Sequence, residues 1–279
     1  MILGIEGEDK CGKSTLAYTA PLPIVGFSFD LGSERAIYGT QFDQHFKGLK
    51  IEKIRFKRGD TAKKAWEGND ITIYELPQPI QLDSNKLIGF TDVWDYFIAL
   101  VGMAAEDCMG VKLSTVVIDT MTLARRIKAD AYLQELQENT PTSGKARKQL
   151  LQIEYGHAND SIRNIYTLFG GIGANLVALH HLTDERKDGL DRDGAVVSML
   201  TGNRILEGLA QTYRYIDVGV RMDKVQGVPT GTLIRCGYNL SMEGDVITSP
   251  TWDKIVNRIS MSVGDRLQFQ RRNSEATGK

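Results

Sequence analysis

The chain has 279 residues, of which 42% are hydrophobic and 25% are charged, a composition typical of a globular protein with a substantial core. Its formal net charge of −1 argues against polyanion binding over the whole surface but allows a local basic patch. Three widely spaced cysteines form neither a metal-binding pattern nor a disulfide framework, which suits the cytoplasm. No apolar run is long enough to span a membrane, and no signal peptide is expected, because a structured motif begins at once.

The stretch from Gly7 to Ser14 reads GEDKCGKS and matches G-x-x-x-x-G-K-S, the pattern of a phosphate-binding P-loop. Gly7 and Gly12 allow backbone angles and close approaches that a Cβ would forbid. Successive N–H groups can then point at phosphate oxygens, aided by the positive end of a following helix. We expect Lys13 to reach the β- and γ-phosphates of ATP and Ser14 to ligate Mg²⁺. The other residues expected to bind the nucleotide are Glu8, Asp9, Lys10, Cys11 and Thr15.

The flanks of this motif supply the strand and the helix that a P-loop needs. Residues 2–5 are apolar and predict a strand, and residues 14–18 predict the start of a helix that must end near Pro21. The alternative, a chance glycine-containing turn, is disfavoured by these flanks.

Residues 23–30 (PIVGFSFD) predict a second buried strand, with Asp30 at its carboxyl end. In open α/β sheets, ligands bind beyond the carboxyl ends of the strands. Asp30 and the nearby Glu34 are therefore candidates to face the nucleotide. The alternative for each is a loop carboxylate or a helix N-cap.

Residues 47–64 form a basic stretch, in which eight lysines and arginines stand against two acids. Ile51, Ile54 and Phe56 interleave with these charges, so the stretch could follow a nucleic-acid backbone. The alternative is a solvated edge strand, since lysines protect edges from mispairing. Residues 71–76 then predict a further strand.

Residues 114–120 (STVVIDT) predict a buried parallel strand that ends in a carboxylate, the Walker B pattern. Asp119 is expected to hold Mg²⁺, directly or through water, opposite Ser14. The alternative is an acid that only caps the next helix.

The remaining segments alternate between helices, strands and polar breaks. A helix is predicted after the polar loop of residues 77–86, and Thr91 or Asp92 is expected to cap it. A buried strand ends in His180 and His181. Helices are predicted over residues 91–106, 121–138, 149–169 and 250–259, strands over 175–179, 215–221, 232–236 and 246–248, a basic mobile loop over 139–148, and a loop or hairpin over 183–201.

This order predicts an α/β fold with mostly parallel central strands, flanking helices and short antiparallel strands near the C-terminus. We expect a single domain over residues 1–260, followed by a polar, partly flexible tail over residues 261–279.

The P-loop stretch IEGEDKCGKSTL resembles that of thymidylate kinases, which carry a similar Glu-Gly-x-Asp stretch before Gly-Lys-Ser-Thr. The resemblance covers about a dozen residues. The second predicted strand continues FSFDLGSER and lacks the Asp-Arg-Tyr motif of that family. An apolar strand that ends at Asp119 also fits those kinases poorly.

The plan of residues 1–235 resembles RecA-like P-loop ATPases, in particular the compact phage-encoded type linked to recombination and single-strand annealing. It does so through the P-loop, the strands ending at Asp30 and Asp119, the helix and strand leading to His180 and His181, and the run LTGNRILEGLA at residues 200–210. The resemblance implies an Mg²⁺-dependent ATPase in the host cytoplasm that acts on single-stranded DNA as a homo-oligomer.

The resemblance also implies particular site residues. RecA-like proteins often place a catalytic glutamate two residues after the acid of the second strand, where this chain has Gly32. Glu34 or Asp30 could replace it. The residue that senses the γ-phosphate matches His180 or His181, of which only one can face the nucleotide, because adjacent strand residues point to opposite faces.

The two DNA-binding loops of the resembled family correspond to residues 139–148 and 184–194 of this chain. The second carries five acids against three bases, which is poor for holding phosphate. The phage-type relatives also tend to carry a basic pair on the last core strand, where this chain has one arginine, Arg235.

Two other functions remain open from the sequence. A nucleoside monophosphate kinase would follow from the likeness of the P-loop to thymidylate kinases. A non-hydrolysing, nucleotide-dependent assembly protein would follow from Gly32 at the position of the expected glutamate.

Overall fold

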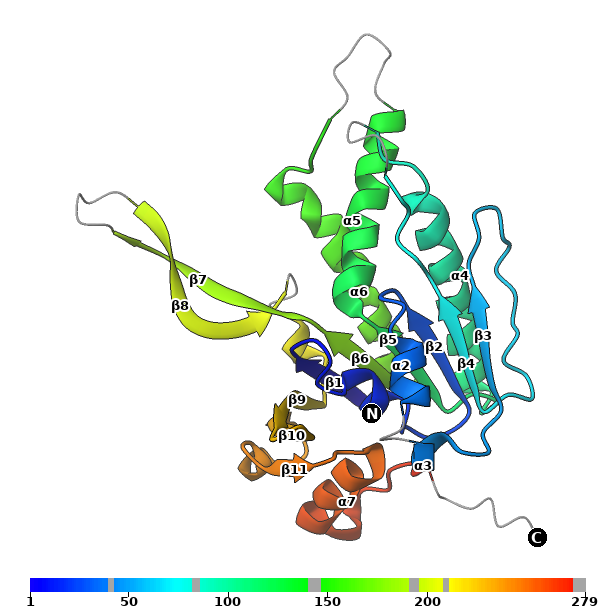
Figure 1. Cartoon of the computed structure of the whole chain (residues 1–279), viewed down its shortest axis with the longest axis vertical. Coiled ribbons are helices and arrows are strands. Elements are labelled where there is room, and N and C mark those ends of the chain that lie inside the picture. The colour runs from blue at the N-terminus through cyan, green and yellow to red at the C-terminus, as the bar shows by residue number, and fades with distance from the viewer. Residues whose placement is uncertain (40–42, 82–85, 140–146, 191–195, 208–210, 273–279) are drawn as a thin grey trace.

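The computed structural model describes residues 1–39, 43–81, 86–139, 147–190, 196–207 and 211–272 (Figure 1). Its strands are β1 (Ile2–Gly7), β2 (Ile24–Ser28), β3 (Ile51–Arg55), β4 (Ile71–Glu75), β5 (Thr115–Asp119), β6 (Asn175–His180), β7 (Leu182–Leu190), β8 (Val196–Leu206), β9 (Val218–Val225), β10 (Val228–Cys236) and β11 (Val246–Thr248).

One nine-stranded sheet forms the centre, in the order β11-β10-β9-β1-β6-β5-β2-β4-β3. Every neighbouring pair from β9 to β3 is parallel, and β10 and β11 extend the sheet in antiparallel fashion. The predicted α/β class is therefore confirmed, with a mostly parallel sheet and antiparallel C-terminal strands. The stretch 215–221 was expected to be antiparallel, and β9 does pair with β10 in this way, but on its other side it pairs with β1 in parallel.

Helices cover both faces of the sheet, as Figure 1 shows. Residues of α4, α5 and α6 join one buried cluster with side chains such as Val116 and Ile118 of β5. Residues of α1, α2, α3 and α7 join a second cluster with Val117 of the same strand. Side chains alternate between the two faces because the strand period is two. The helices are α1 (Lys13–Ala17), α2 (Ser33–Tyr38), α3 (Asp43–Phe46), α4 (Phe90–Met109), α5 (Met121–Glu138), α6 (Tyr155–Gly171) and α7 (Trp252–Val263).

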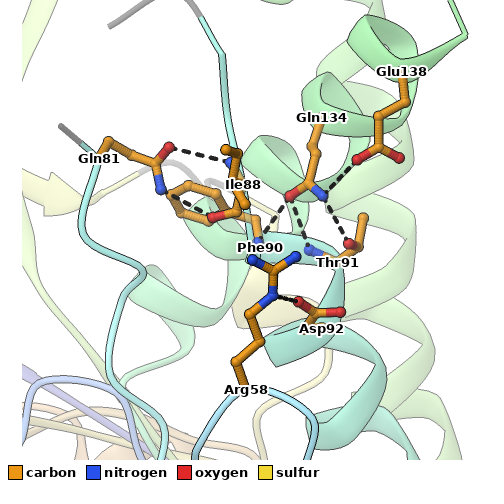
Figure 2. A network of polar contacts seen from close by, with 8 residues as sticks. All are labelled: Arg58, Gln81, Ile88, Phe90, Thr91, Asp92, Gln134 and Glu138. Carbon is orange, nitrogen blue, oxygen red and sulfur yellow. Dashed lines mark hydrogen bonds and ion pairs between the residues drawn. The ribbon is translucent and has the colours of Figure 1, made fainter. Parts of the chain in front are cut away.

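The start of α4 differs from expectation. Its N-cap is Gly89, in the left-handed conformation, and neither Thr91 nor Asp92 caps it. Gln134 of α5 acts as the cap instead, because its Oε1 accepts a hydrogen bond from the backbone N–H of Phe90 at 2.9 Å (Figure 2). A side chain from a distant helix thus satisfies one of the first N–H groups of α4, which have no partner within the helix.

The other helices agree with the sequence to different degrees. The helix over 121–138 is confirmed as α5. The helix expected from residue 149 begins instead at Tyr155, after a 3₁₀ turn over Gln152–Glu154, and runs on to Gly171. Residues 140–146 of the predicted basic loop lie outside the described residues.

The charged segment after β6 is a long hairpin of β7 and β8, which projects from the body in Figure 1. A hairpin was one of the two alternatives expected there. Residues 191–195, and 208–210 of the run that resembles RecA-like proteins, lie outside the described part of the chain.

The C-terminal segment packs on the body as far as residue 272. The helix α7 passes the expected domain boundary at residue 260 and ends at Val263. Arg272 donates to the backbone carbonyl of Tyr18, directly after α1, and stacks its guanidinium on Phe46. The described part of the tail expected over residues 261–279 therefore contacts the body at Arg272, while residues 273–279 lie outside the described range.

Among the described residues, no helix has the length and apolarity needed to cross a membrane. The same residues contain no group of three or more histidines, cysteines and acids that could hold a metal ion by themselves.

Candidate functional site

The carboxyl ends of four neighbouring parallel strands meet at one edge of the sheet, in the order β1-β6-β5-β2. The P-loop follows β1, His181 follows β6, Asp119 ends β5 and Asp30 follows β2. This edge is where ligands bind in open α/β sheets. A cavity of about 300 Å³ lies there, and its lining is Asp9, Lys10, Gly12, Lys13, Ser14, Thr15, Asp30, Gly32, Arg35, Ala36, Asp119 and His181.

The first P-loop glycine is required by a close approach of the neighbouring strand. A Cβ at Gly7 would lie 2.4 Å from the carbonyl oxygen of Met222 in β9, so any other residue would force the two strands apart. Gly12 has a φ of 97°, a left-handed angle that glycine adopts without strain. Both glycines therefore serve the loop geometry that the sequence pattern predicted.

Lys13 is folded back over its own loop. Its Nζ donates to the carbonyl oxygens of Gly7 at 2.8 Å and Glu8 at 2.7 Å. The side chain is buried, and the ammonium is held at the cavity by two acceptors that carry no formal charge. Its positive charge thus remains available to an anion.

The helix after the loop is short. The helix α1 has five residues and begins at Lys13, and its N-cap, Gly12, offers no side-chain hydrogen bond. A helix dipole that arises from so few peptide units is small, because it sums over aligned units. The backbone N–H groups of the loop and the Lys13 ammonium are therefore the main attraction for phosphate here, and less comes from the helix than the sequence suggested.

Asp119 is the most unusual titratable group of the site. Its carboxylate is 1% exposed, and neither oxygen has a hydrogen bond of good geometry in the described structure, although the nearby Ser14 hydroxyl favours its charged form. Burial is the largest cause that raises the pKa of Asp119, to about 7, and the charge of Asp30 raises it further, while Ser14 and Lys13 act to lower it. A buried carboxylate without partners is costly.

The residues present fit a Mg²⁺ ion. The Ser14 hydroxyl and the Asp119 carboxylate line the same cavity, and both are oxygen ligands of the kind Mg²⁺ prefers. A divalent cation would give the orphaned Asp119 oxygens the partner that the protein does not supply. Mg²⁺ commonly uses one or two protein ligands and takes the rest from phosphates and water.

Asp30 and Arg35 face the cavity from the segment after β2. Asp30 accepts a hydrogen bond from the backbone N–H of Gly32 at 2.8 Å. A Cβ at Gly32 would lie 3.1 Å from the Asp30 carboxylate and 3.4 Å from the Arg35 guanidinium, so these three residues are crowded together. The sequence reasoning missed Arg35, although a cation five residues after the strand-ending acid was a usable signal.

The two histidines lie in different environments. His180 is buried, and its Nε2 lies 2.8 Å from the Tyr166 hydroxyl, with which it shares a hydrogen bond. Burial lowers the pKa of His180 to about 3, so it is neutral. His181 lines the cavity, and its backbone N–H donates to Thr122 at 3.0 Å. Burial lowers the pKa of His181, with a smaller effect from Lys13.

Three further candidates point elsewhere. Glu34 is largely exposed and pairs with Lys53 of β3 at 3.3 Å. The thiol of Cys11 is buried and donates to the carbonyl of Glu8 at 2.9 Å. The Glu8 side chain pairs at 2.9 Å with Arg204 of the β7–β8 hairpin. None of the three is among the residues that line the cavity.

The comparisons with known proteins add little to this geometry. No protein-family model matches the sequence, and a search of curated proteins gave no match. Among solved structures, the chain is similar to a KaiC-like protein from the hyperthermophilic archaeon Pyrococcus horikoshii OT3, with 11% identity, a TM-score of 0.39 and 89% of each chain covered. It is also similar to an ATPase from the type III secretion system of pathogenic bacteria, with 11% identity and a TM-score of 0.39.

The second likeness covers 80% of this chain and 52% of that ATPase, so the chain spans about half its length. At TM-scores under 0.5, neither likeness extends what the strand order and the P-loop geometry establish. The cavity itself combines loop amides, a lysine, a hydroxyl and a buried carboxylate. Such a set can bind a nucleoside triphosphate with Mg²⁺ and stabilise charge on its phosphates.

Proposed function

We propose that this chain binds ATP with Mg²⁺ and hydrolyses it slowly, as a RecA-like ATPase. The observation that carries this proposal is the orphaned Asp119 carboxylate, which shares one cavity with Ser14 and Lys13. A metal ion with a triphosphate is the ligand that would satisfy all three groups together.

Each residue then has a role set by its chemistry. The loop amides from Glu8 to Thr15 and the Lys13 ammonium bind the phosphates, while Ser14 and Asp119 hold Mg²⁺. His181, which lines the cavity, senses the γ-phosphate, and His180 positions the strand end through its bond to Tyr166. Asp30 orients the attacking water, since Glu34 is drawn away by Lys53.

Slow turnover follows from the residue at position 32. Gly32 lines the cavity where a water-activating glutamate was expected, and Asp30 must act from a position fixed by its bond to the Gly32 N–H. A general base contributes about 10²–10⁴-fold to a rate. This observation also favours the second candidate function, a nucleotide-dependent assembly protein that binds ATP with negligible turnover.

The biological role that the resemblance suggests is single-stranded DNA recombination or annealing in a phage, by a homo-oligomer. One contact supports a link between a projecting element and the nucleotide. Arg204 of the β7–β8 hairpin pairs with both Glu8 of the P-loop at 2.9 Å and Asp184 of its own hairpin at 3.3 Å. Single-stranded DNA that binds the hairpin would therefore alter the contact between Arg204 and Glu8 of the P-loop.

The test is ATP turnover, measured as ADP release, with and without Mg²⁺, single-stranded DNA and each nucleoside monophosphate. Turnover that needs Mg²⁺ and rises with DNA is the expected result. ADP that appears only with a monophosphate would overturn the ATPase proposal in favour of a kinase. Tight binding of a fluorescent ATP analogue without ADP release would establish the assembly protein instead. Asp119→Asn should abolish turnover, because it removes a ligand of Mg²⁺.

A further inference from the structure

A second and larger cavity, of about 1030 Å³, lies beside the nucleotide site. It is built at the carboxyl ends of β2, β3 and β4, against the first turn of α4 and one side of α5. Its inner wall is apolar and includes the buried side chains of Phe29, Phe56 and Val93. Apart from Asp30, which lines both cavities, the proposed ATPase chemistry uses none of its lining residues.

Side-chain hydrogen bonds fix the rim of this cavity (Figure 2). The amide of Gln81 donates to the carbonyl of Ile88 at 3.0 Å and accepts from its N–H at 3.1 Å, which ties together the two arms that flank residues 82–85. Arg58 pairs with Asp92 in the first turn of α4 at 2.8 Å. The rim is therefore a formed structure in the described chain.

The lining is strongly cationic. Arg55, Arg58, Lys86 and Arg126 contribute to it, and Asp30 is the one carboxylate among the lining residues that the structure describes. Arg58 is paired with Asp92, and Arg126 is paired with Glu207 at 3.0 Å. Arg55 forms no ion pair with any described residue, so its charge is available to an anionic ligand.

Apolar side chains surround the mouth. Ile80 is 86% exposed, Ile88 43% and Leu31 37%. Clustered apolar surface of this kind, beside a deep apolar wall, is typical of protein interaction sites. A ligand that covers it must carry apolar groups outside the cavity as well as inside, which a small molecule held within the cavity would not provide.

We propose that this cavity binds an acidic peptide segment of a partner protein, with an aromatic or aliphatic side chain against the apolar wall and carboxylates at Arg55 and Lys86. Charge complementarity favours an anion, and burial of an apolar anchor supplies affinity. A nucleobase fits the cavity less well, because its polar edge would lie against hydrocarbon. A base would also need hydrogen-bond partners for its edge. Of the two side-chain amides in the lining, that of Gln81 already bonds to Ile88, and the other is that of Gln78.

The test is fluorescence anisotropy of a fluorescein-labelled peptide, DDFDDLF, with the full chain. Two control peptides are used: KKFKKLF reverses the charge, and DDGDDSG removes the apolar anchors. The expected result is binding of the first peptide alone. Arg55→Glu and Ile80→Asp should each weaken it by about tenfold or more. Lys57→Glu is the matched control, because Lys57 is exposed in the same segment but does not line the cavity, and it should leave binding unchanged.

A second measurement locates the peptide. With benzoylphenylalanine in place of its first Phe, photo-crosslinks are expected on the residues of the cavity wall. Thermal melting and ATP-analogue binding of each variant establish that the chain is folded, and they keep failure of this proposal distinct from failure of the ATPase proposal. The proposal would be overturned if the folded wild-type protein does not bind the peptide, if Lys57→Glu weakens binding as much as Arg55→Glu does, or if the crosslinks lie elsewhere. It would also be overturned if the protein binds dT20 but no peptide, and Arg55→Glu and Ile80→Asp lose the dT20 binding. That result would indicate a nucleic-acid site.

Discussion

Lys13 donates from its ammonium to the carbonyl oxygen of Gly7 over 2.8 Å, so the P-loop lysine is held by the first residue of its own motif. Because the acceptor is a neutral carbonyl, a phosphate group competes for the ammonium with a large electrostatic advantage. The loop thus keeps Lys13 at the cavity before any anion binds.

Lys13→Met should abolish ATP binding, because the stem remains while the charge at the phosphates is lost. The fold should persist, since the two lost hydrogen bonds are worth about 1 kcal/mol each. Titration with a fluorescent ATP analogue and thermal melting measure the two effects. Lys57→Met is the control, because Lys57 is exposed and does not line the nucleotide cavity, and it should leave ATP binding unchanged. Retained ATP binding in Lys13→Met would refute the phosphate role.

Asp119→Asn should change the pH dependence of stability without Mg²⁺. Burial raises the pKa of Asp119 from 3.8 to about 7, so between these values the folded protein holds a proton that the unfolded chain has released. The stabilisation is complete below pH 3.8 and is lost as pH rises to about 7. Relative to wild type, the variant should therefore gain unfolding free energy as pH rises, by at most about 1.4 kcal/mol per pH unit. Urea melts at several pH values test this, and a constant difference would contradict it.

His180→Gln should change the same curve with the opposite sign. Burial lowers the pKa of His180 from 6.5 to about 3, so its stabilisation is complete above pH 6.5 and is lost as pH falls to about 3. The deficit of the variant relative to wild type should shrink as the solution is acidified through this interval. At pH 8 neither Asp119 nor His180 contributes a slope, which gives the reference point. A deficit that grows on acidification would show that His180 is not buried as a neutral ring.

Cys11 should resist alkylation in the native protein. Its thiol is buried against Gly7, and burial is the largest cause that raises its pKa, so the reactive thiolate is rare at pH 7. Maleimide labelling followed by mass spectrometry of the Cys11 peptide measures this, with urea-unfolded protein as the fully reactive control. Rapid native labelling that ATP suppresses would instead place the thiol at the nucleotide.

Arg204→Ala should separate the hairpin from the P-loop. The Arg204–Glu8 pair is exposed on both sides, and such pairs add about 0–1 kcal/mol to stability, so the melting temperature should hardly change. We expect basal ATP turnover to persist and its stimulation by single-stranded DNA to fall. Arg186→Ala, which removes another exposed cation of the same hairpin, is the matched control. Equal loss in both variants would indicate DNA contact by charge alone rather than coupling through Glu8.

The parts of the site that the sequence predicted are those fixed by local pattern. The P-loop spacing, the strand that ends at Asp119 and the helix α5 depend on neighbours in the chain, and the structure has all three. The missed parts depend on distant partners. Gln134 caps α4 across a helix pair, and β9 takes its direction from β1. The choice between His180 and His181 depends on Tyr166, which no periodicity reveals.

The place of β1 in the sheet has a consequence for synthesis on the ribosome. Its Ile2 pairs with Leu176 of β6, and its Leu3 pairs with Val218 of β9. The strand that leads into the P-loop is translated long before both of its neighbours. Such long-range pairing is slow to form, so a nascent chain should acquire affinity for nucleotide only after β9 has left the exit tunnel. Until then, the apolar β1 stays exposed to chaperones and to wrong partners.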